Sequence, residues 1–338
     1  MKAIEITSPG TVALIEREKP LPGRGEVLLR MKYVGFCGSD LSTYLGKNPL
    51  VQYPRIPGHE ISAVVEANGI EVPDSIQPGQ RVTVVPYTNC GICSSCRQKR
   101  YNACRYNQTL GVQRDGAFAE YIVLPWQKVL PVDGLSSTQL ALVEPLTVGF
   151  HAIDNGLVTD SDTVLVLGSG MIGMGAIIRA NLRGATVIAA DIDDSKLRLA
   201  EKVGAQFTIN TRTQNTHSRL EQLTGGNGPD VVVEAAGNPA TYLSSVEEVA
   251  FSGRVVCIGY TNSEVTFPTK LWVQKEIRIF GSRNANPSDF EAVIKYFKQK
   301  TVDVSLLISD IIKPETAGDA MRKWAGNPGE ILKILVEF

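Results

Sequence analysis

The second half of the chain alternates short apolar runs with stretches whose apolar residues have helical spacing. The stretch 195–203, for example, repeats apolar residues every three to four positions and ends at Gly204, a residue type common just beyond a helix. Apolar runs separated by such helices are typical of parallel strands buried on both faces. The pattern predicts an α/β fold with a doubly wound parallel sheet, with strands at 163–167, 186–190, 206–209, 230–235, 254–258 and 277–280.

The first 130 residues have a different hydrophobic pattern, because glycine and proline divide them into short apolar runs. Closely spaced short strands suggest a compact β-barrel rather than strand–helix–strand units. The predicted strands are 2–6, 26–34, 60–67, 81–86 and 118–124.

The change from closely spaced short strands to alternating strands and helices predicts the domain organisation. A helix at 146–153 leads into the parallel sheet, and a helix at 288–298 and a strand at 331–336 close the chain. We expect a first domain at 1–148, a second at 149–274, and a segment, 275–338, that returns to the first domain.

Charge and hydropathy limit the classes of partner. The 338 residues carry a net charge of −1 with acids and bases interspersed, which argues against nucleic acid or an anionic membrane as the main partner. The N-terminus has no apolar signal-peptide core. The longest uncharged stretch, 163–178, is too short to span a bilayer. We therefore expect a cytoplasmic protein that binds small molecules.

A glycine-rich turn follows the predicted strand 163–167, in the sequence Gly168-Ser-Gly170-Met171-Ile172-Gly173, and Asp191 closes the next strand. The first glycine allows a tight turn, the second lets the backbone approach a pyrophosphate, and the third lets helix and strand pack closely. An ordinary loop is the alternative, but the two strands and the acid favour a dinucleotide site. We expect NAD rather than NADP, since the Asp191 carboxylate would repel a 2′-phosphate.

Four of the six cysteines form a C-x2-C-x2-C-x7-C pattern at Cys90, Cys93, Cys96 and Cys104. Two-residue gaps let sulfurs converge, and four thiolates fill the tetrahedral sphere of Zn²⁺ with no open position. Unrelated thiols or an iron–sulfur cluster are the alternatives, and nothing else in the chain suggests electron transfer. The pattern predicts a structural zinc lobe at about 88–106.

A second set of metal-ligand residues is dispersed over three motifs, Gly35-Phe-Cys37-Gly-Ser39-Asp40, Pro57-Gly58-His59-Glu60 and Val143-Glu144-Pro145. The chain has three histidines, and each can be weighed. His217 lies among polar residues and is expected on an exposed helix, and His151 on the helix at 146–153. His59 follows a glycine and precedes an acid, which favours a metal ligand.

Together these motifs resemble the zinc-dependent medium-chain alcohol dehydrogenases, in particular the sorbitol and polyol dehydrogenase branch. The resemblance covers essentially the whole chain and includes Asp115–Tyr121 and Val143–Leu146. Within that branch, 53–60 and 281–285 look most like bacterial L-galactonate or L-gulonate 5-dehydrogenases. The resemblance implies a GroES-like β-barrel catalytic domain, a Rossmann domain, and a homodimer or homotetramer.

The resemblance also implies roles for individual residues. Cys37 and His59 would bind a catalytic zinc with Glu60 or Glu144 as third ligand, which leaves one open position. Ser39 and Glu144 would be catalytic side chains, with Ser39 accepting the proton of the alcohol, and Asp40 would orient His59. The implied cofactor contacts are Gly168, Gly170, Met171, Ile172, Gly173, Asp191, Lys196 and Arg283.

The chain departs from the family pattern at two places. Leu41-Ser42 stands where the family often has a proton-relay histidine, and Gln113-Arg114 stands where close relatives often have histidine. The first departure leaves the proton route open. The second suggests, with Arg283, a guanidinium partner for a substrate carboxylate.

The expected reaction is oxidation of a secondary hydroxyl of a sugar acid or polyol by NAD⁺, with two zinc ions per chain. Sorbitol-, threonine- or butanediol-type dehydrogenases on the same fold are alternatives. A non-catalytic, nucleotide-sensing relative is an alternative of another class. Loss of Cys37, His59 or both glutamates would have favoured that last class, and all four residues are present.

Overall fold

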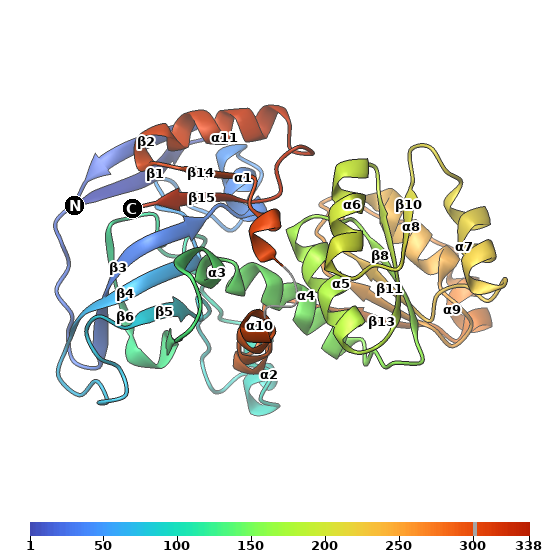
Figure 1. Cartoon of the computed structure of the whole chain (residues 1–338), viewed down its shortest axis with the longest axis horizontal. Helices are drawn as coiled ribbons and strands as arrows, with labels where there is room; N and C mark the ends of the chain where they lie inside the picture. The colour runs from blue at the N-terminus through green and yellow to red at the C-terminus, as the bar shows by residue number, and fades with distance from the viewer. Residues whose placement is uncertain (300–302) are drawn as a thin grey trace. The chain divides into compact units, whose positions relative to one another are not determined.

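The computed structural model describes residues 1–299 and 303–338. The described chain forms two compact units, one of Met1–Glu144 with Ile294–Phe338 and one of Pro145–Val293. Figure 1 shows both chain ends in the first unit, where the blue N-terminal strands lie near the red C-terminal strand β15. The domain boundaries expected at 148 and 274 stay a prediction.

The first unit is built on mainly antiparallel sheets of short strands. A seven-stranded sheet has the order β14-β15-β3-β4-β5-β7, with β6 also paired to β3, and β1 and β2 form a separate pair. The strands are β1 Lys2–Ser8, β2 Thr11–Glu16, β3 Glu26–Gly35, β4 Glu60–Asn68, β5 Arg81–Val84, β6 Tyr121–Pro125, β7 Val129–Pro131, β14 Asp310–Ile312 and β15 Ile334–Glu337. The expectation of a domain of short strands in the first part of the chain is confirmed.

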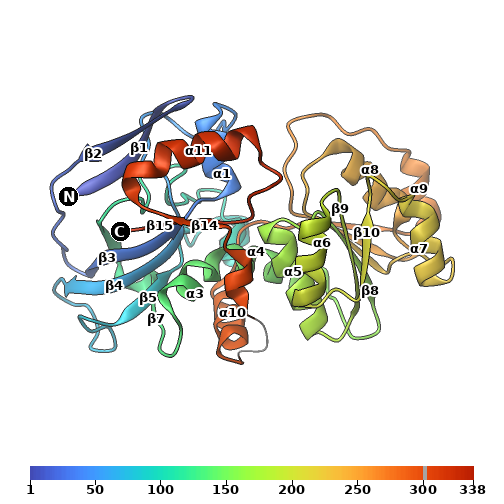
Figure 2. The ribbon, with the colours of Figure 1, turned by 45° about the horizontal axis from the view of Figure 1, so that its top comes forward.

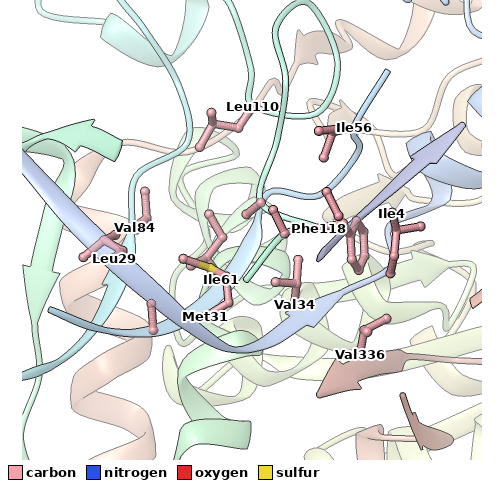
Figure 3. Close-up of a cluster of buried hydrophobic side chains, with 14 of the residues drawn as sticks. Ile4, Leu29, Met31, Val34, Ile56, Ile61, Val84, Leu110, Phe118 and Val336 are labelled. Carbon is pink, nitrogen blue, oxygen red and sulfur yellow. The ribbon is translucent and has the colours of Figure 1, made fainter. Parts of the chain in front are cut away.

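The core of the first unit joins residues from both ends of the chain. Figure 3 shows Ile4, Met31, Ile61 and Val336 among its buried side chains, and each is at most 2 % exposed. Phe118 packs there too, with its ring centroid 4.4 Å from that of Phe36. The C-terminal strand β15 pairs antiparallel with β3, so the last residues of the chain complete a sheet begun by the first.

The helices of the first unit are short. They are α1 Gly38–Tyr44, α2 Ser94–Arg97, α3 Ser137–Ala141 and α11 Ala317–Gly326, with 3-10 turns η1 Tyr101–Ala103, η2 Trp126–Lys128, η3 Val304–Leu307 and η4 Pro314–Thr316. The α1 helix begins where β3 ends, and the Cys37 backbone N–H donates to Asp40 Oδ2 at 2.9 Å. This capping contact turns the chain sharply after Cys37. The sequence did not reveal α1, since seven residues are too few to show a helical period.

The second unit is a doubly wound parallel sheet, as the pattern predicts. Its order is β10-β9-β8-β11-β12-β13, with β8 Thr163–Leu167, β9 Thr186–Asp191, β10 Phe207–Asn210, β11 Val231–Glu234, β12 Arg254–Cys257 and β13 Arg278–Gly281. The strand order reverses at β8, where open α/β sheets form their binding crevice.

Helices connect these strands and cover the sheet. They are α5 Met171–Leu182, α6 Asp194–Val203, α7 Thr216–Thr224, α8 Pro239–Glu248 and α9 Thr269–Lys275, preceded by α4 Val143–Asn155 and followed by α10 Pro287–Gln299. Figures 1 and 2 show α5 and α6 on one face of the sheet and α8 and α9 on the other. Within the described ranges, no helix has the length and apolar character needed to cross a membrane.

Candidate active site

The four cysteines of the lobe converge on one point. Cys90 and Cys96 sulfurs lie 4.0 Å apart, and Cys93 and Cys104 sulfurs lie 3.9 Å apart. Tetrahedral zinc with bonds of about 2.3 Å places its sulfur ligands about 3.8 Å from one another. Backbone N–H groups of Arg105 and Cys96 lower the pKa of Cys93 to about 6, which favours the thiolate that zinc needs. The donor set therefore fits the structural zinc predicted from the spacing.

A second group brings together Cys37, His59 and Glu60, whose candidate ligand atoms all lie within 4.8 Å of one another. Cys37 lies between β3 and α1, while Glu60 is the first residue of β4 and pairs with Gly35 of β3. A Cβ at Gly35 would lie 2.0 Å from Glu60 Oε2. A side chain at position 35 would therefore displace the Glu60 carboxylate from its place beside β3.

His59 is held in a tight, buried turn. Gly58 has φ +102°, and a Cβ on it would lie 2.6 Å from the Phe118 ring. Burial lowers the pKa of His59, but Cys37, Glu144 and Asp40 raise it by more, so that the net shift is well upward. The surroundings that favour a proton on His59 would equally favour a metal cation. This group of three therefore fits a catalytic zinc with one position left open.

Three polar atoms in and around this group are buried without a hydrogen-bond partner among the described residues. Among the described residues, no hydrogen bond is made by the Ser39 hydroxyl or by His59 Nδ1. Asp40 accepts from the Cys37 backbone through Oδ2, while its Oδ1 lacks a partner within the same ranges. The expected orientation of His59 by Asp40 stays a prediction, since Asp40 acts on His59 here through charge. Burial, opposed by His59, raises the pKa of Asp40 to about 6.

Glu60 forms a buried ion pair with Lys333. The Lys333 Nζ lies 2.5 Å from each Glu60 carboxylate oxygen and donates to the Phe36 carbonyl at 2.8 Å. Burial lowers the pKa of Lys333, but Glu60 and Cys37 raise it by more, and the net shift is upward. Lys333 is therefore a charged neighbour of the metal group.

Glu144, on the first turn of α4, has a different partner. The Tyr87 hydroxyl donates to Glu144 Oε1, and both side chains are buried. Burial raises the pKa of Glu144, opposed by His59. Glu144 is not among the atoms that cluster within 4.8 Å in the described chain. The two candidates for third ligand are thus distinguished by distance and by partner.

The cofactor motif has the backbone geometry that its glycines imply. Gly168 has φ +96°, and a Cβ at Gly173 would lie 1.9 Å from the Gly168 carbonyl oxygen. Gly170 is the N-cap of α5, followed by Met171, and has open space where a Cβ would lie. A pyrophosphate can therefore approach the backbone at the start of α5.

Asp191 faces this turn from the end of β9. Its carboxylate accepts from the Ser169 backbone at 2.7 Å and from the Asp193 backbone at 3.0 Å. The N-cap of α6 is Asp193, which accepts from Ser195 and Lys196. Asp191 is therefore not the helix cap, which was the alternative to a role in ribose binding.

The remaining residues predicted to contact the cofactor or the substrate lie in three different segments of the chain. Lys196 lies in the first turn of α6, and Arg283 follows β13. Arg114 lies in a loop of the first unit that also contains Gly111. A Cβ on Gly111 would lie only 2.4 Å from the Gly58 backbone nitrogen. This loop therefore packs closely against the turn that carries His59. The Arg114 Nε is buried and has no hydrogen-bond partner among the described residues.

The two other histidines lie outside both metal groups. His151 on α4 is buried, and its Nδ1 lies 3.0 Å from Asp289 Oδ2. His217 is exposed on α7, with Nδ1 2.9 Å from Glu248. Both positions agree with those expected from the sequence.

Sequence reasoning missed Tyr87, Lys128 and Lys333. A signal existed for Lys333, because it is a single charge inside the apolar run 331–336 and is 3 % exposed. A charge at a position whose neighbours are buried implies a partner. Nothing local marks Tyr87, whose partner is 57 residues away.

Comparison with known proteins decides the family. Residues 23–134 match the family model described as "Alcohol dehydrogenase GroES-like domain", and residues 172–299 match "Zinc-binding dehydrogenase". The chain belongs to the zinc-binding medium-chain alcohol dehydrogenases. It is therefore a zinc-dependent NAD(P) alcohol or polyol dehydrogenase, with a structural four-cysteine zinc site and a catalytic Cys/His/Glu site.

Three relatives show the breadth of this family. L-galactonate-5-dehydrogenase of Escherichia coli is 30% identical, with 100% of this chain and 99% of the relative covered. Sorbitol dehydrogenase of Halalkalibacterium halodurans is 33% identical, with 99% of each covered. A solved Escherichia coli structure, described as a short chain alcohol dehydrogenase complexed with NADH, has a TM-score of 0.92 at 31% identity, covering 100% and 99% of the chains. The first two relatives are named for different substrates, so identity at this level leaves the substrate of this chain open.

Proposed function

We propose that this dehydrogenase oxidises a secondary hydroxyl of a sugar acid of the L-galactonate or L-gulonate type, with NAD⁺ as acceptor. The observation that carries the substrate class is Arg114, a partly buried guanidinium in the loop that packs against the His59 turn. Burial lowers its pKa, and its Nε has no partner among the described residues. A partly buried guanidinium whose Nε has no partner among the described residues is suited to a carboxylate.

A second cation supports the same interpretation. Burial, followed by the nearby charge of Arg114, lowers the pKa of Lys128. Its Nζ lies 3.4 Å from the Asn89 side-chain oxygen, which is a neutral partner. Two neighbouring cations, each partly buried, favour an anionic group on the substrate.

Different residues of the chain would bind the zinc and accept the proton at the reacting hydroxyl. Cys37, His59 and a glutamate would hold the zinc, which acidifies a bound alcohol as it acidifies water. The Ser39 hydroxyl, buried without a partner, would accept the proton of the alcohol. Ser42 cannot take up a proton as imidazole can, so we assign no relay base to the α1 helix.

The test compares an aldonate with its neutral alditol. We expect a higher kcat/KM for L-galactonate or L-gulonate than for the matching alditol. Replacing Arg114 or Arg283 by alanine should shrink that preference by about 10-fold to 100-fold, since a charged hydrogen bond contributes about 1.5–3 kcal/mol. Arg322→Ala is the matched control, because this arginine is 74% exposed and pairs with Asp319.

The outcome also separates the alternatives. Sorbitol or xylitol turning over faster than every aldonate would move the assignment to a plain polyol dehydrogenase. Preference for threonine or butanediol would assign the chain to those branches. No cofactor reduction with any alcohol would favour a nucleotide-sensing role.

A second prediction concerns cofactor choice. We expect a higher kcat/KM with NAD⁺ than with NADP⁺, because the Asp191 carboxylate lies beside the glycine turn and Asp193 and Asp194 add further negative charge. Replacing Asp191 by asparagine should reduce the ratio at least about tenfold, since it removes the repulsion of a 2′-phosphate. Steady-state kinetics with both cofactors would measure it, and a wild type that prefers NADP⁺ would refute it.

We also propose a homodimer or homotetramer that works in the cytoplasm. Strand β13 is an edge of the parallel sheet. Its residue Ile279 is 40% exposed, and Val273 on the preceding helix α9 is 85% exposed. Exposed apolar edges favour pairing with another chain, and a reducing compartment suits cysteine ligands. Light scattering that gives a monomeric mass at micromolar concentration would exclude the oligomer.

A further inference from the structure

A buried carboxylate lies at the carboxyl end of the parallel sheet in the second unit. Glu234 is the last residue of β11 and is 0% exposed. Strand β11 lies between β8 and β12 (Figure 1), and Glu234 pairs in register with Leu167 of β8 and Cys257 of β12. Glu234 is therefore at the same end of the sheet as the glycine turn and Asp191.

One oxygen of this carboxylate holds the chain that follows β11. Its Oε1 accepts from the backbone N–H groups of Ala236 at 3.0 Å and Gly237 at 2.8 Å, and from the Thr241 hydroxyl at 2.7 Å. Three donors directed at one oxygen stabilise a carboxylate rather than a neutral acid. All three donors are neutral, and Oε2 has no hydrogen-bond partner among the described residues. Glu234 is thus a buried charge without a hydrogen-bonded cation in the described chain.

Glu234 also contacts the loop that follows β12. Its backbone carbonyl accepts from the Ile258 N–H at 2.9 Å and the Gly259 N–H at 3.1 Å. A Cβ on Gly259 would lie 2.6 Å from Glu234 Oε2 and 2.3 Å from the Gly237 nitrogen, so the two loops and the carboxylate are closely packed. Burial, and then the charge of Glu234, raise the pKa of Cys257 to about 11. The charge therefore acts on the ends of both strands.

The strand order relates Glu234 to one half of the cofactor. A doubly wound sheet of this kind has two mononucleotide-binding halves, which meet where the strand order reverses. The glycine turn after β8 and Asp191 at the end of β9 belong to the half expected to hold the adenosine. The ends of β11 and β12, where Glu234 lies, are left for the nicotinamide nucleotide.

A buried charge at this place acts differently on the two forms of the cofactor. NAD⁺ has a positive charge on its nicotinamide ring, and NADH does not. A carboxylate inside the protein is screened less than one at the surface and attracts a nearby cation. Its charge would therefore favour the oxidised form, whereas a purely structural contact would change both affinities alike.

We propose that Glu234 is a positioning residue for the nicotinamide half of the cofactor, which holds together the loops after β11 and β12 and whose negative charge raises the affinity for NAD⁺ relative to NADH. It acts on both cofactor forms through the loops, and on the oxidised form through its charge. The proposal rests on the nicotinamide cofactor and is independent of the substrate.

Cofactor binding, measured without alcohol, tests the proposal. Calorimetry gives the dissociation constants of NAD⁺ and NADH for the wild type and each variant. Glu234→Gln keeps the size and an acceptor for the three donors but removes the charge. It should weaken NAD⁺ relative to NADH about 10-fold, the size expected for opposite charges roughly 10 Å apart inside a protein. Glu201→Gln is the matched control, because it removes a carboxylate from an exposed position on α6, and should leave both constants at their wild-type values.

Glu234→Asp separates the two roles. It keeps the charge but shortens the side chain, so both affinities should fall together, with their ratio within a few-fold of wild type. A wild-type ratio in a folded Glu234→Gln would overturn the proposal. If Glu234→Gln does not fold, Glu234→Asp decides, and wild-type affinities for both forms, or a ratio displaced about tenfold toward NADH, would overturn the proposal. A wild type that binds neither NAD⁺ nor NADH would instead overturn the proposed function.

Discussion

Replacing Cys37 by serine is expected to abolish turnover and leave the fold intact. The thiolate is one of three ligands in the Cys37–His59–Glu60 group, and a serine hydroxyl stays protonated and binds zinc poorly. Bound zinc lowers the pKa of a hydroxyl by up to about 9 units, or roughly 12 kcal/mol. Losing even a third of that would slow kcat about a thousandfold. Serine is also a good N-cap for α1, so the strand-to-helix turn should persist.

Three measurements check this prediction together, namely kcat, zinc per chain and the melting temperature. Zinc should fall from two per chain to one, with the melting temperature close to that of wild type. Cys257→Ser is the matched control, since Cys257 lies on β12 outside both metal groups and should keep both zinc ions. Full activity with one zinc in Cys37→Ser would contradict the role of this site.

Replacing Cys93 by serine should instead lower stability. The four sulfurs at 3.9–4.0 Å fit zinc without an open position, and binding at such a site contributes folding free energy. The regular structure of the lobe is short, namely the 4-residue helix α2 and the 3-residue 3-10 turn η1. A loss of about 3 kcal/mol would lower the melting temperature by roughly 6–12 °C.

Thermal unfolding with and without a chelator measures this effect. Ser95→Ala changes a residue of the same helix that lies between two ligands and should retain zinc and the wild-type melting temperature. A Cys93→Ser protein that binds one zinc fewer and melts with the wild type would show that the lobe adds nothing to stability.

Local patterns in the sequence determined the second unit closely. The predicted strand 163–167 coincides with β8, and the helix predicted at 195–203 begins one residue earlier, at Asp194. Buried parallel strands appear in a sequence as continuous apolar runs, and helices as apolar residues repeated every three to four positions. Both can therefore be predicted without knowing which distant residues they contact. The turn at Gly168 likewise depends on residues within a few positions.

The metal-ligand types were also readable from the sequence, because cysteine, histidine and acid motifs carry their chemistry with them. The tertiary structure alone decided which side chains surround those ligands. Lys333 meets Glu60 across 273 residues, and this pairing depends on β15 joining the edge of β3. Tyr87 lies in the loop that follows β5, and its contact with Glu144 requires this loop to lie beside the start of α4. A contact between distant segments leaves no periodicity in the chain, and only packing of the whole unit brings the partners together.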